Sequence, residues 1–139
     1  MSTNNVMDSV ASPVIRVLRR EEGDDQIEVS VEFVTAEATC PRCGAVTNKV
    51  HDRRTQRKRD QAEELKPVWL LLEKRRFRCG NCDHVFTEQD PLCGPRRRST
   101  ERLREALRDA VTGNPVKHVA RLQQVSRVAV YRAMHEETT

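Results

Sequence analysis

The chain has 139 residues, of which 37% are hydrophobic and 4% aromatic, which is enough apolar material for one or two small domains but not for a large core. No apolar run approaches the ~20 residues of a membrane-spanning helix, and the polar amino terminus lacks the basic and apolar regions of a signal peptide. These features argue against membrane and secreted proteins, and we expect a protein of the reducing cytoplasm.

The net charge of +4 is concentrated in the middle of the chain. Residues 1–39 carry three basic and eight acidic residues (−5), residues 40–104 carry 17 and nine (+8), and residues 105–139 carry five and four (+1). The charges come in runs. This distribution favours a polyanionic partner, such as nucleic acid, over a merely solvated surface.

The first half of the chain is predicted to form β-strands. Residues 1–13 are expected to be a disordered tail. Residues 14–18 and 26–35 alternate apolar and polar side chains, and the turn signal between them, Glu22-Gly23-Asp24-Asp25, predicts a hairpin. Further strands are predicted at residues 46–50, 68–77 and 85–87, whereas the polar stretch 60–66, ended by Pro67, is expected to be a loop.

Two Cys-x-x-Cys pairs lie between these strands. Cys40 and Cys43 form the first pair, and Cys79 and Cys82 form the second after 35 intervening residues. Two such turns bring four thiolates around one ion, so the pattern predicts a structural zinc site in which separate hairpins carry the two turns. Two disulfides are the alternative, which the expected reducing compartment disfavours.

Basic residues follow both cysteine pairs. A basic run covers residues 53–59, and Arg96, Arg97 and Arg98 end a connector that contains two prolines and a glycine. The connector with these prolines starts at Asp90, and its residues 93–98 are the predicted boundary between a β domain at residues 14–92 and a helical domain at residues 99–136. Cys93 has no partner cysteine in sequence and is predicted to be a free thiol.

Beyond residue 98 the apolar period changes from two to 3.6. Ser99 or Thr100 is predicted to cap a helix that ends near Gly113, Pro115 to open a second helix, and Ser126 to cap a third. The predicted inward residues are Leu103, Ala106, Leu107, Ala110, Val111, Val116, Val119, Ala120, Val125, Val130, Ala133 and Met134. The fold class is therefore α+β, a zinc-ribbon-like β domain followed by a three-helix helix-turn-helix domain, with a plain helical hairpin as the alternative for the last part.

Together these parts resemble the amino-terminal region of ISL-three family transposases. The matching pieces are Cys40-Pro41-Arg42-Cys43-Gly44, Val50-His51, Arg75-Arg76-Phe77-Arg78-Cys79, Phe86-Thr87-Glu88 and Ser99-Thr100-Glu101-Arg102-Leu103. The chain departs from the family pattern in the loop expected between Asp60 and Pro67.

The resemblance implies sequence-specific binding of double-stranded DNA at the terminal inverted repeats of a mobile element, and hence a nucleoid-associated protein. The catalytic domain of that family follows this region, and the chain ends five residues after Met134, so we expect no enzymatic activity and carry over no catalytic residue. Two alternatives stay open, a fragment of an active split transposase and a zinc-stapled RNA or protein adaptor. The partner of the first would be a separately encoded catalytic chain, and a homodimer is a further expectation.

The predicted site residues fall into two groups. The zinc ligands are Cys40, Cys43, Cys79 and Cys82, with His51 and His84 as weaker ligand candidates; the resemblance also gives His51 a structural or phosphate-contacting role. The predicted DNA contacts are Arg53, Arg54, Arg57, Arg75, Arg76, Arg96, Arg97, Arg98, Ser126, Arg127, Tyr131 and Arg132.

Overall fold

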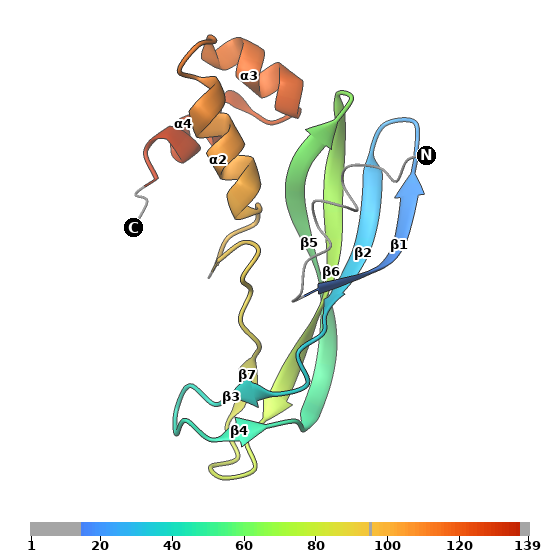
Figure 1. Cartoon of the computed structure of the whole chain (residues 1–139), viewed down its shortest axis with the longest axis vertical. Helices are drawn as coiled ribbons and strands as arrows, with labels where there is room; N and C mark the ends of the chain where they lie inside the picture. Colours follow the sequence, from blue (N-terminus) through green and yellow to red (C-terminus); the bar gives the residue numbers. More distant parts are fainter. Residues whose placement is uncertain (1–14, 95, 137–139) are drawn as a thin grey trace.

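A computed structural model describes residues 15–94 and 96–136, so the tail predicted for residues 1–13 lies outside the described residues. The described residues form an α+β fold, as predicted, with a mixed sheet and three helices. The elements in order are β1 (Ile15–Glu22), β2 (Ile27–Phe33), β3 (Ala38–Thr39), β4 (Val46–Thr47), β5 (Val50–Glu63), β6 (Lys66–Arg78), β7 (Val85–Thr87), α2 (Glu101–Ala110), α3 (Val116–Gln123) and α4 (Arg127–Met134). Figure 1 shows an elongated molecule with β3, β4 and β7 at one end and the helices at the other.

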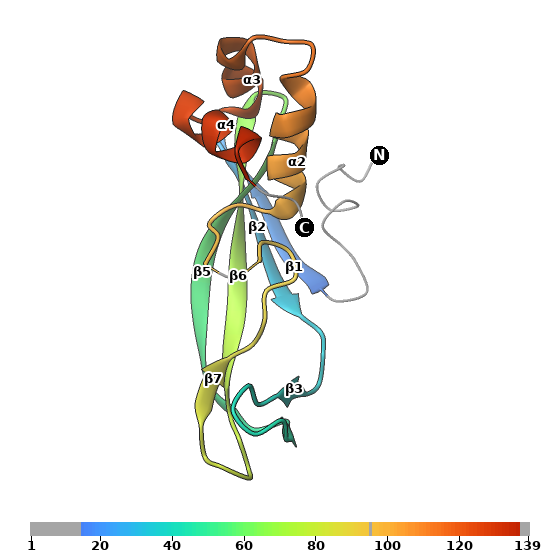
Figure 2. The same cartoon turned by 90° about the vertical axis from the view of Figure 1, so that its left-hand side faces the viewer.

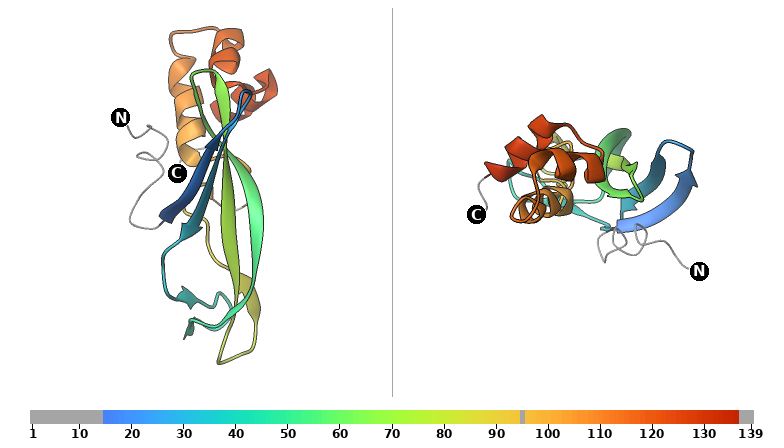
Figure 3. Two further views of the ribbon diagram at one scale, coloured as in Figure 1. Left: turned by 90° about the vertical axis from the view of Figure 1, so that its right-hand side faces the viewer. Right: turned by 90° about the horizontal axis from the view of Figure 1, so that it is seen from above.

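The main sheet has the strand order β1-β2-β6-β5, and β7 pairs with the end of β6. The predicted β1–β2 hairpin is confirmed, whereas β2 runs parallel to β6, with Ile27 opposite Val68 and Val31 opposite Leu72. Alternate residues of both strands point to one face and form the core of the sheet, into which Leu92 also packs. The sheet is strongly curved when seen from above (Figure 3), as expected for twisted strands.

The loop predicted at residues 60–66 is wrong, because residues 60–63 belong to a long strand that begins at Val50. This strand is the 14-residue β5, which pairs along β6 from Val50 opposite Phe77 to Glu63 opposite Lys66. Strand β5 was missed because it carries charged side chains on both faces and so has no apolar alternation. Its pairing comes from β6, whose apolar side chains hold the hairpin in register with the core.

The turn between β5 and β6 consists of Glu64 and Leu65, both with positive φ (51° and 68°). Two successive positive φ values are typical of a two-residue hairpin turn that matches the twist of its strands. Neither residue is glycine or asparagine, so the sequence carried no turn signal here. Ion pairs join this tip to the β1–β2 turn, with Arg20 Nη2 2.8 Å from Glu63 Oε1 and Lys66 Nζ 3.1 Å from Glu22 Oε2.

The helices begin at the predicted caps. The side chain of Thr100 accepts a hydrogen bond from the backbone N–H of Leu103, and that of Ser126 from the N–H of Ala129. Six residues form their buried core: Leu103, Leu107, Val119, Ala120, Val130 and Ala133. Met134, predicted to point inward, is 41% exposed because it lies in the last turn of α4, beyond the helices that cover Val130 and Ala133.

The helices pack beside the far half of β5, as Figure 2 shows from the side. Gln124 ends α3 in the left-handed conformation (φ 54°, ψ 46°), a position where glycine is common, and α4 starts three residues later at Arg127. Among the described residues, no helix is long and apolar enough to cross a membrane.

Candidate metal centre and basic surface

The two cysteine pairs lie on two hairpins, as predicted. The first turn joins β3 to β4, and the second joins β6 to β7. In each turn the backbone carbonyl of the first cysteine accepts a hydrogen bond from the N–H of the residue four positions later. Gly44 N donates to Cys40 O (2.9 Å), and Asp83 N donates to Cys79 O (3.1 Å). Gly44 and Asp83 both have positive φ (79° and 66°), so the two turns share one local geometry.

The four thiols converge at one point. Cys40 Sγ lies 3.7 Å from Cys82 Sγ, Cys43 Sγ lies 3.5 Å from Cys79 Sγ, and all four sulfur atoms lie within 4.8 Å of one another. A tetrahedron with zinc–sulfur distances of about 2.3 Å has edges of about 3.8 Å, so the cluster fits one zinc ion. The distances are far longer than a disulfide bond of about 2.05 Å, and all five cysteines are free.

Hydrogen-bond donors surround the sulfur atoms. The backbone N–H groups of Asn81 and Cys82 point at Cys79 Sγ (3.3 and 3.4 Å), and Asn81 Nδ2 lies 3.5 Å from Cys43 Sγ. The Asn81 amide, followed by the backbone N–H of Ala45, lowers the pKa of the Cys43 thiol to about 6. At Cys43 these donors favour the thiolate, the form in which cysteine binds a metal.

Two phenylalanines form the apolar support of the centre. Phe77 is fully buried and packs with Cys40, Cys79 and Phe86, whose ring centroid is 6.0 Å away. The hydroxyl of buried Thr47 donates to the backbone carbonyl of Arg78 (2.8 Å), which joins the two hairpins. The positions of the sulfur atoms therefore depend on β6 and β7 as well as on the two short turns.

Neither candidate histidine belongs to the cysteine cluster. His51 is exposed, with Nδ1 3.3 Å from Arg78 Nη2, and His84 stacks on Phe86 at 6.2 Å. Cys93 is also outside the cluster and fully buried, and burial raises the pKa of its thiol to about 12.

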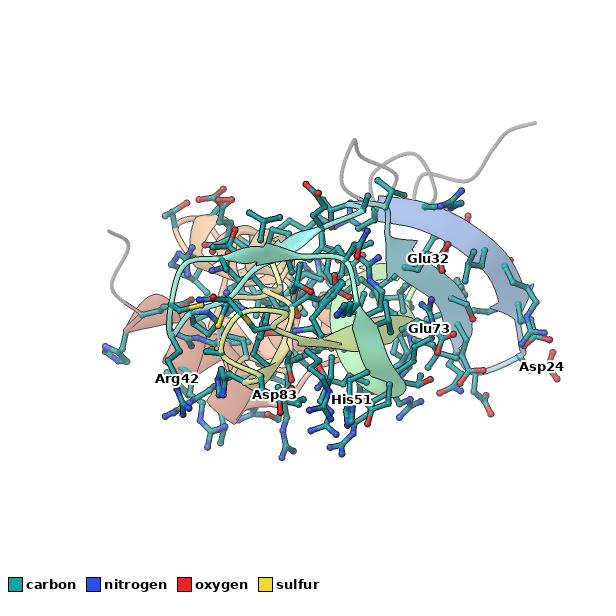
Figure 4. The ribbon with its side chains drawn as sticks, turned by 90° about the horizontal axis from the view of Figure 1, so that it is seen from below. Asp24, Glu32, Arg42, His51, Glu73 and Asp83 are labelled. Carbon is teal, nitrogen blue, oxygen red and sulfur yellow. The ribbon has the colours of Figure 1, made fainter. Side chains whose placement is uncertain are left out.

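The predicted arginines of β5 and β6 divide into two sets. Arg53 and Arg54 are exposed, and they lie opposite Arg75 and Lys74 in the sheet. Arg53 and Arg54 have no carboxylate directly opposite them on β6, so their charges face solvent. Figure 4 shows nitrogen-tipped side chains projecting along the side of the molecule where Arg42, Asp83 and His51 are labelled, away from Glu32, Glu73 and Asp24.

The second set has intramolecular partners. Arg75 makes bidentate contacts with the buried carboxylate of Glu88 (2.8 and 3.0 Å), and Arg76 makes bidentate contacts with Asp52 (2.7 and 2.8 Å). Arg57 stacks over Trp69, with its Cζ atom 3.8 Å from the ring centroid, and donates to Gln26. These three side chains brace the sheet, and their contacts could not be foreseen because each partner is distant in sequence.

The connector arginines are all exposed. Arg97 also pairs with Glu136 at 2.9 Å, and Glu136 in turn contacts Arg104 and Arg108 of α2. Arg96 has a positive φ of 60°, so the backbone turns sharply there. Arg96 and Arg98 are exposed in the segment that leads from β7 to α2.

One face of α4 is also on the surface. Ser126, Arg127, Tyr131 and Arg132 are exposed, as predicted from the inward positions of Val130 and Ala133. Val128, at 54% exposure, adds an apolar side chain to this face. Tyr131 is 48% exposed, so two large side chains with apolar surface lie beside two arginines.

Two residues of β5 that were not predicted as site residues, Arg59 and Asp60, lie where the sheet meets the helices. Asp60 of β5 is completely buried and binds Thr100 and Arg102, and Arg59 donates to backbone carbonyl groups at the end of α3. Asp60 is an isolated acidic residue at the end of a basic run, which was the one available signal.

One family model matches the chain. The zinc-finger of transposase IS204/IS1001/IS1096/IS1165 matches residues 36–82, about a third of the chain (47 of 139 residues). The match begins just before β3 and ends at the fourth cysteine, so it covers the metal centre and the β5–β6 hairpin but not the helices. No curated protein and no solved structure was found to match the chain.

Proposed function

We propose that the chain is a DNA-binding module that recognises terminal inverted repeats, because residues 36–82 match the zinc-finger of transposases. The family match supports a role in transposition. The observation that carries the DNA-binding role is the combination of a zinc centre, an exposed basic surface beside it, and an exposed arginine-bearing helix at the other end of β5.

The ribbon is proposed to contact the DNA backbone. Arg53 and Arg54 project from β5 beside the metal centre, and Arg42 lies in the first cysteine turn. Arginines on strands and turns suit phosphates, which fix the position of a protein on DNA without reading its sequence. Arg96 and Arg98 of the connector extend this basic surface toward the helices.

Helices α3 and α4 are proposed to form a helix-turn-helix unit, with α4 in the major groove. The left-handed Gln124 supports a tight turn, and Ser126 caps a helix whose first turn exposes Arg127. An arginine at that position can bind a guanine through two hydrogen bonds, and exposed Val128 can contact a thymine methyl group. The exposed side chains of α4 thus match the chemistry of base edges.

Changing Arg127 to alanine is expected to reduce discrimination between a preferred and a scrambled duplex by about 1–3 kcal/mol, because a bidentate guanine contact would be lost. Changing Arg98 to alanine should instead weaken binding to both duplexes alike and reduce the slope of log affinity against log salt by about one unit. The measurement is a titration of both variants at several salt concentrations, on a duplex selected by the chain from a random pool.

Arg98 is the matched control, since it is exposed and belongs to no helix or strand. If the Arg127 variant lost affinity equally on both duplexes, α4 would not be a recognition helix, and the carboxy-terminal helices would have a packing role. An excess of RNA that displaced the preferred duplex would favour the adaptor alternative.

A further inference from the structure

We infer that Arg59 and Asp60 are positioning residues that lock the helices to β5, so that the ribbon and α4 meet DNA at one fixed spacing and helical phase. This inference rests on the proposed function, but the lock itself is a property of the free protein. It concerns two adjacent residues of β5 that share no contact with the metal centre.

Asp60 holds the beginning of α2. Its carboxylate is fully buried and accepts hydrogen bonds from Thr100 Oγ1 (2.8 Å) and Arg102 Nε (2.8 Å), while Arg102 Nη2 contacts its second oxygen. The same Thr100 hydroxyl accepts from Leu103 N (3.3 Å) and so caps the helix. The first turn of α2 is thereby fixed to the strand by a charge that has no contact with water.

Arg59 holds the end of α3. Its guanidinium donates to the backbone carbonyl of Gln124 (2.6 Å) and to that of Gln123. These carbonyls belong to the C-terminus of α3, where a cation also interacts favourably with the helix dipole. The side-chain oxygen of Gln123 accepts a hydrogen bond from the backbone N–H of Ala62 (2.8 Å). A side chain of β5 therefore binds the helix end, and a side chain of the helix end binds β5.

The backbone completes the contact. Arg59 N donates to Arg98 O (2.8 Å), and Thr100 N donates to Arg59 O (2.9 Å), so the segment before α2 adds one short bridge to the edge of β5. Helix α4 starts three residues after Gln124, and its inner face packs against α2 and α3. Rotation of α4 relative to the ribbon would break contacts at both α2 and α3.

A buried carboxylate adds little net stability to the contact between two elements, because desolvating the charge offsets most of the gain from its ion pair. Such groups are well attested where they fix one arrangement among several. An arrangement fixed in this way matters for a reader of DNA. Contacts made by the two ends of the molecule fall on the same face of the duplex only at one position within each turn of about 10–10.5 base pairs.

The test uses the full zinc-loaded chain and the duplex selected from a random pool. An insertion of about five base pairs, which is half a helical turn, is placed at each base-pair step of the site in turn. When the insertion lies between the sequences bound by the two ends of the protein, the two ends can no longer bind together, so wild-type binding should weaken by about a hundredfold. The variants Arg59→Met and Asp60→Ala should bind the parent and inserted duplexes within about threefold of each other. Comparing the two duplexes for each variant cancels any general loss of affinity.

Glu63→Gln is the matched control. It removes one negative charge from the same strand and breaks an ion pair, but its partner Arg20 belongs to β1 and not to the helices. This variant should keep the wild-type response to the insertion. A wild-type chain that tolerated the insertion at every step, or Arg59→Met protein with the wild-type response, would overturn the inference.

A second measurement needs no DNA. In ¹⁵N relaxation experiments the helices and the sheet of the wild-type chain should tumble as one body, and the helices of the Arg59→Met variant should tumble faster than the sheet. Independent tumbling in the wild type would refute the lock even if no duplex were ever selected. Conversely, selection of no duplex with rigid wild-type tumbling would refute the proposed function and leave the lock intact.

Discussion

Changing Cys79 to serine is expected to unfold the ribbon end of the molecule and abolish zinc binding. The cysteine is buried and lies within the four-sulfur cluster, and a structural zinc contributes on the order of 10 kcal/mol to folding. A loss of that size is comparable to the whole stability of about 5–15 kcal/mol that is usual for a small domain. Elemental analysis should find one zinc per wild-type chain, and circular dichroism should show loss of strand signal in the variant.

Cys93→Ala is the control for this experiment. Cys93 is buried like Cys79 but lies outside the cluster, so its alanine variant should still bind one zinc ion. A wild-type chain without zinc and with two disulfides by mass would contradict the metal centre. So would Cys79→Ser protein that retained one zinc and its fold.

Changing Phe77 to alanine should give the second largest effect, a loss of about 3–5 kcal/mol in the free energy of unfolding. The ring is fully buried, packs against Cys40 and Cys79, and stacks with Phe86, so its removal leaves a cavity beside the sulfur atoms. Urea denaturation of the zinc-loaded protein measures the loss. A chelator titration should also show weaker retention of zinc.

Val46→Ala is the matched control, since Val46 lies on strand β4 of the first cysteine hairpin but is 59% exposed. Its change should cost no more than about 0.5 kcal/mol. Equal losses in the two variants would mean that Phe77 is not the apolar support of the centre.

The parts of the fold that the sequence predicted are those with local signals. Each of these parts depends on residues close together in the chain. They are the two Cys-x-x-Cys turns, the β1–β2 hairpin, the caps at Thr100 and Ser126, and most of the inward helical faces. Turn chemistry and periodicity act over a few residues, so they can be read without knowing the tertiary structure.

The parts that were missed depend on distant partners. Strand β5 is charged on both faces and forms because β6 lies beside it, and the parallel pairing of β2 with β6 joins segments about 40 residues apart. The contacts of Arg75 with Glu88 and of Asp60 with Arg102 likewise exist only in the folded chain. An arginine in a basic run therefore looks the same in sequence whether it faces a ligand or a carboxylate.

Selection of bound duplexes from a random DNA pool tests the proposed function most directly. The zinc-loaded chain should enrich a motif with defined bases, as expected for a helix that reads the major groove, and excess RNA should not displace it. A pool that stayed random after repeated selection, or a motif lost to RNA competition, would contradict sequence-specific DNA recognition by this chain.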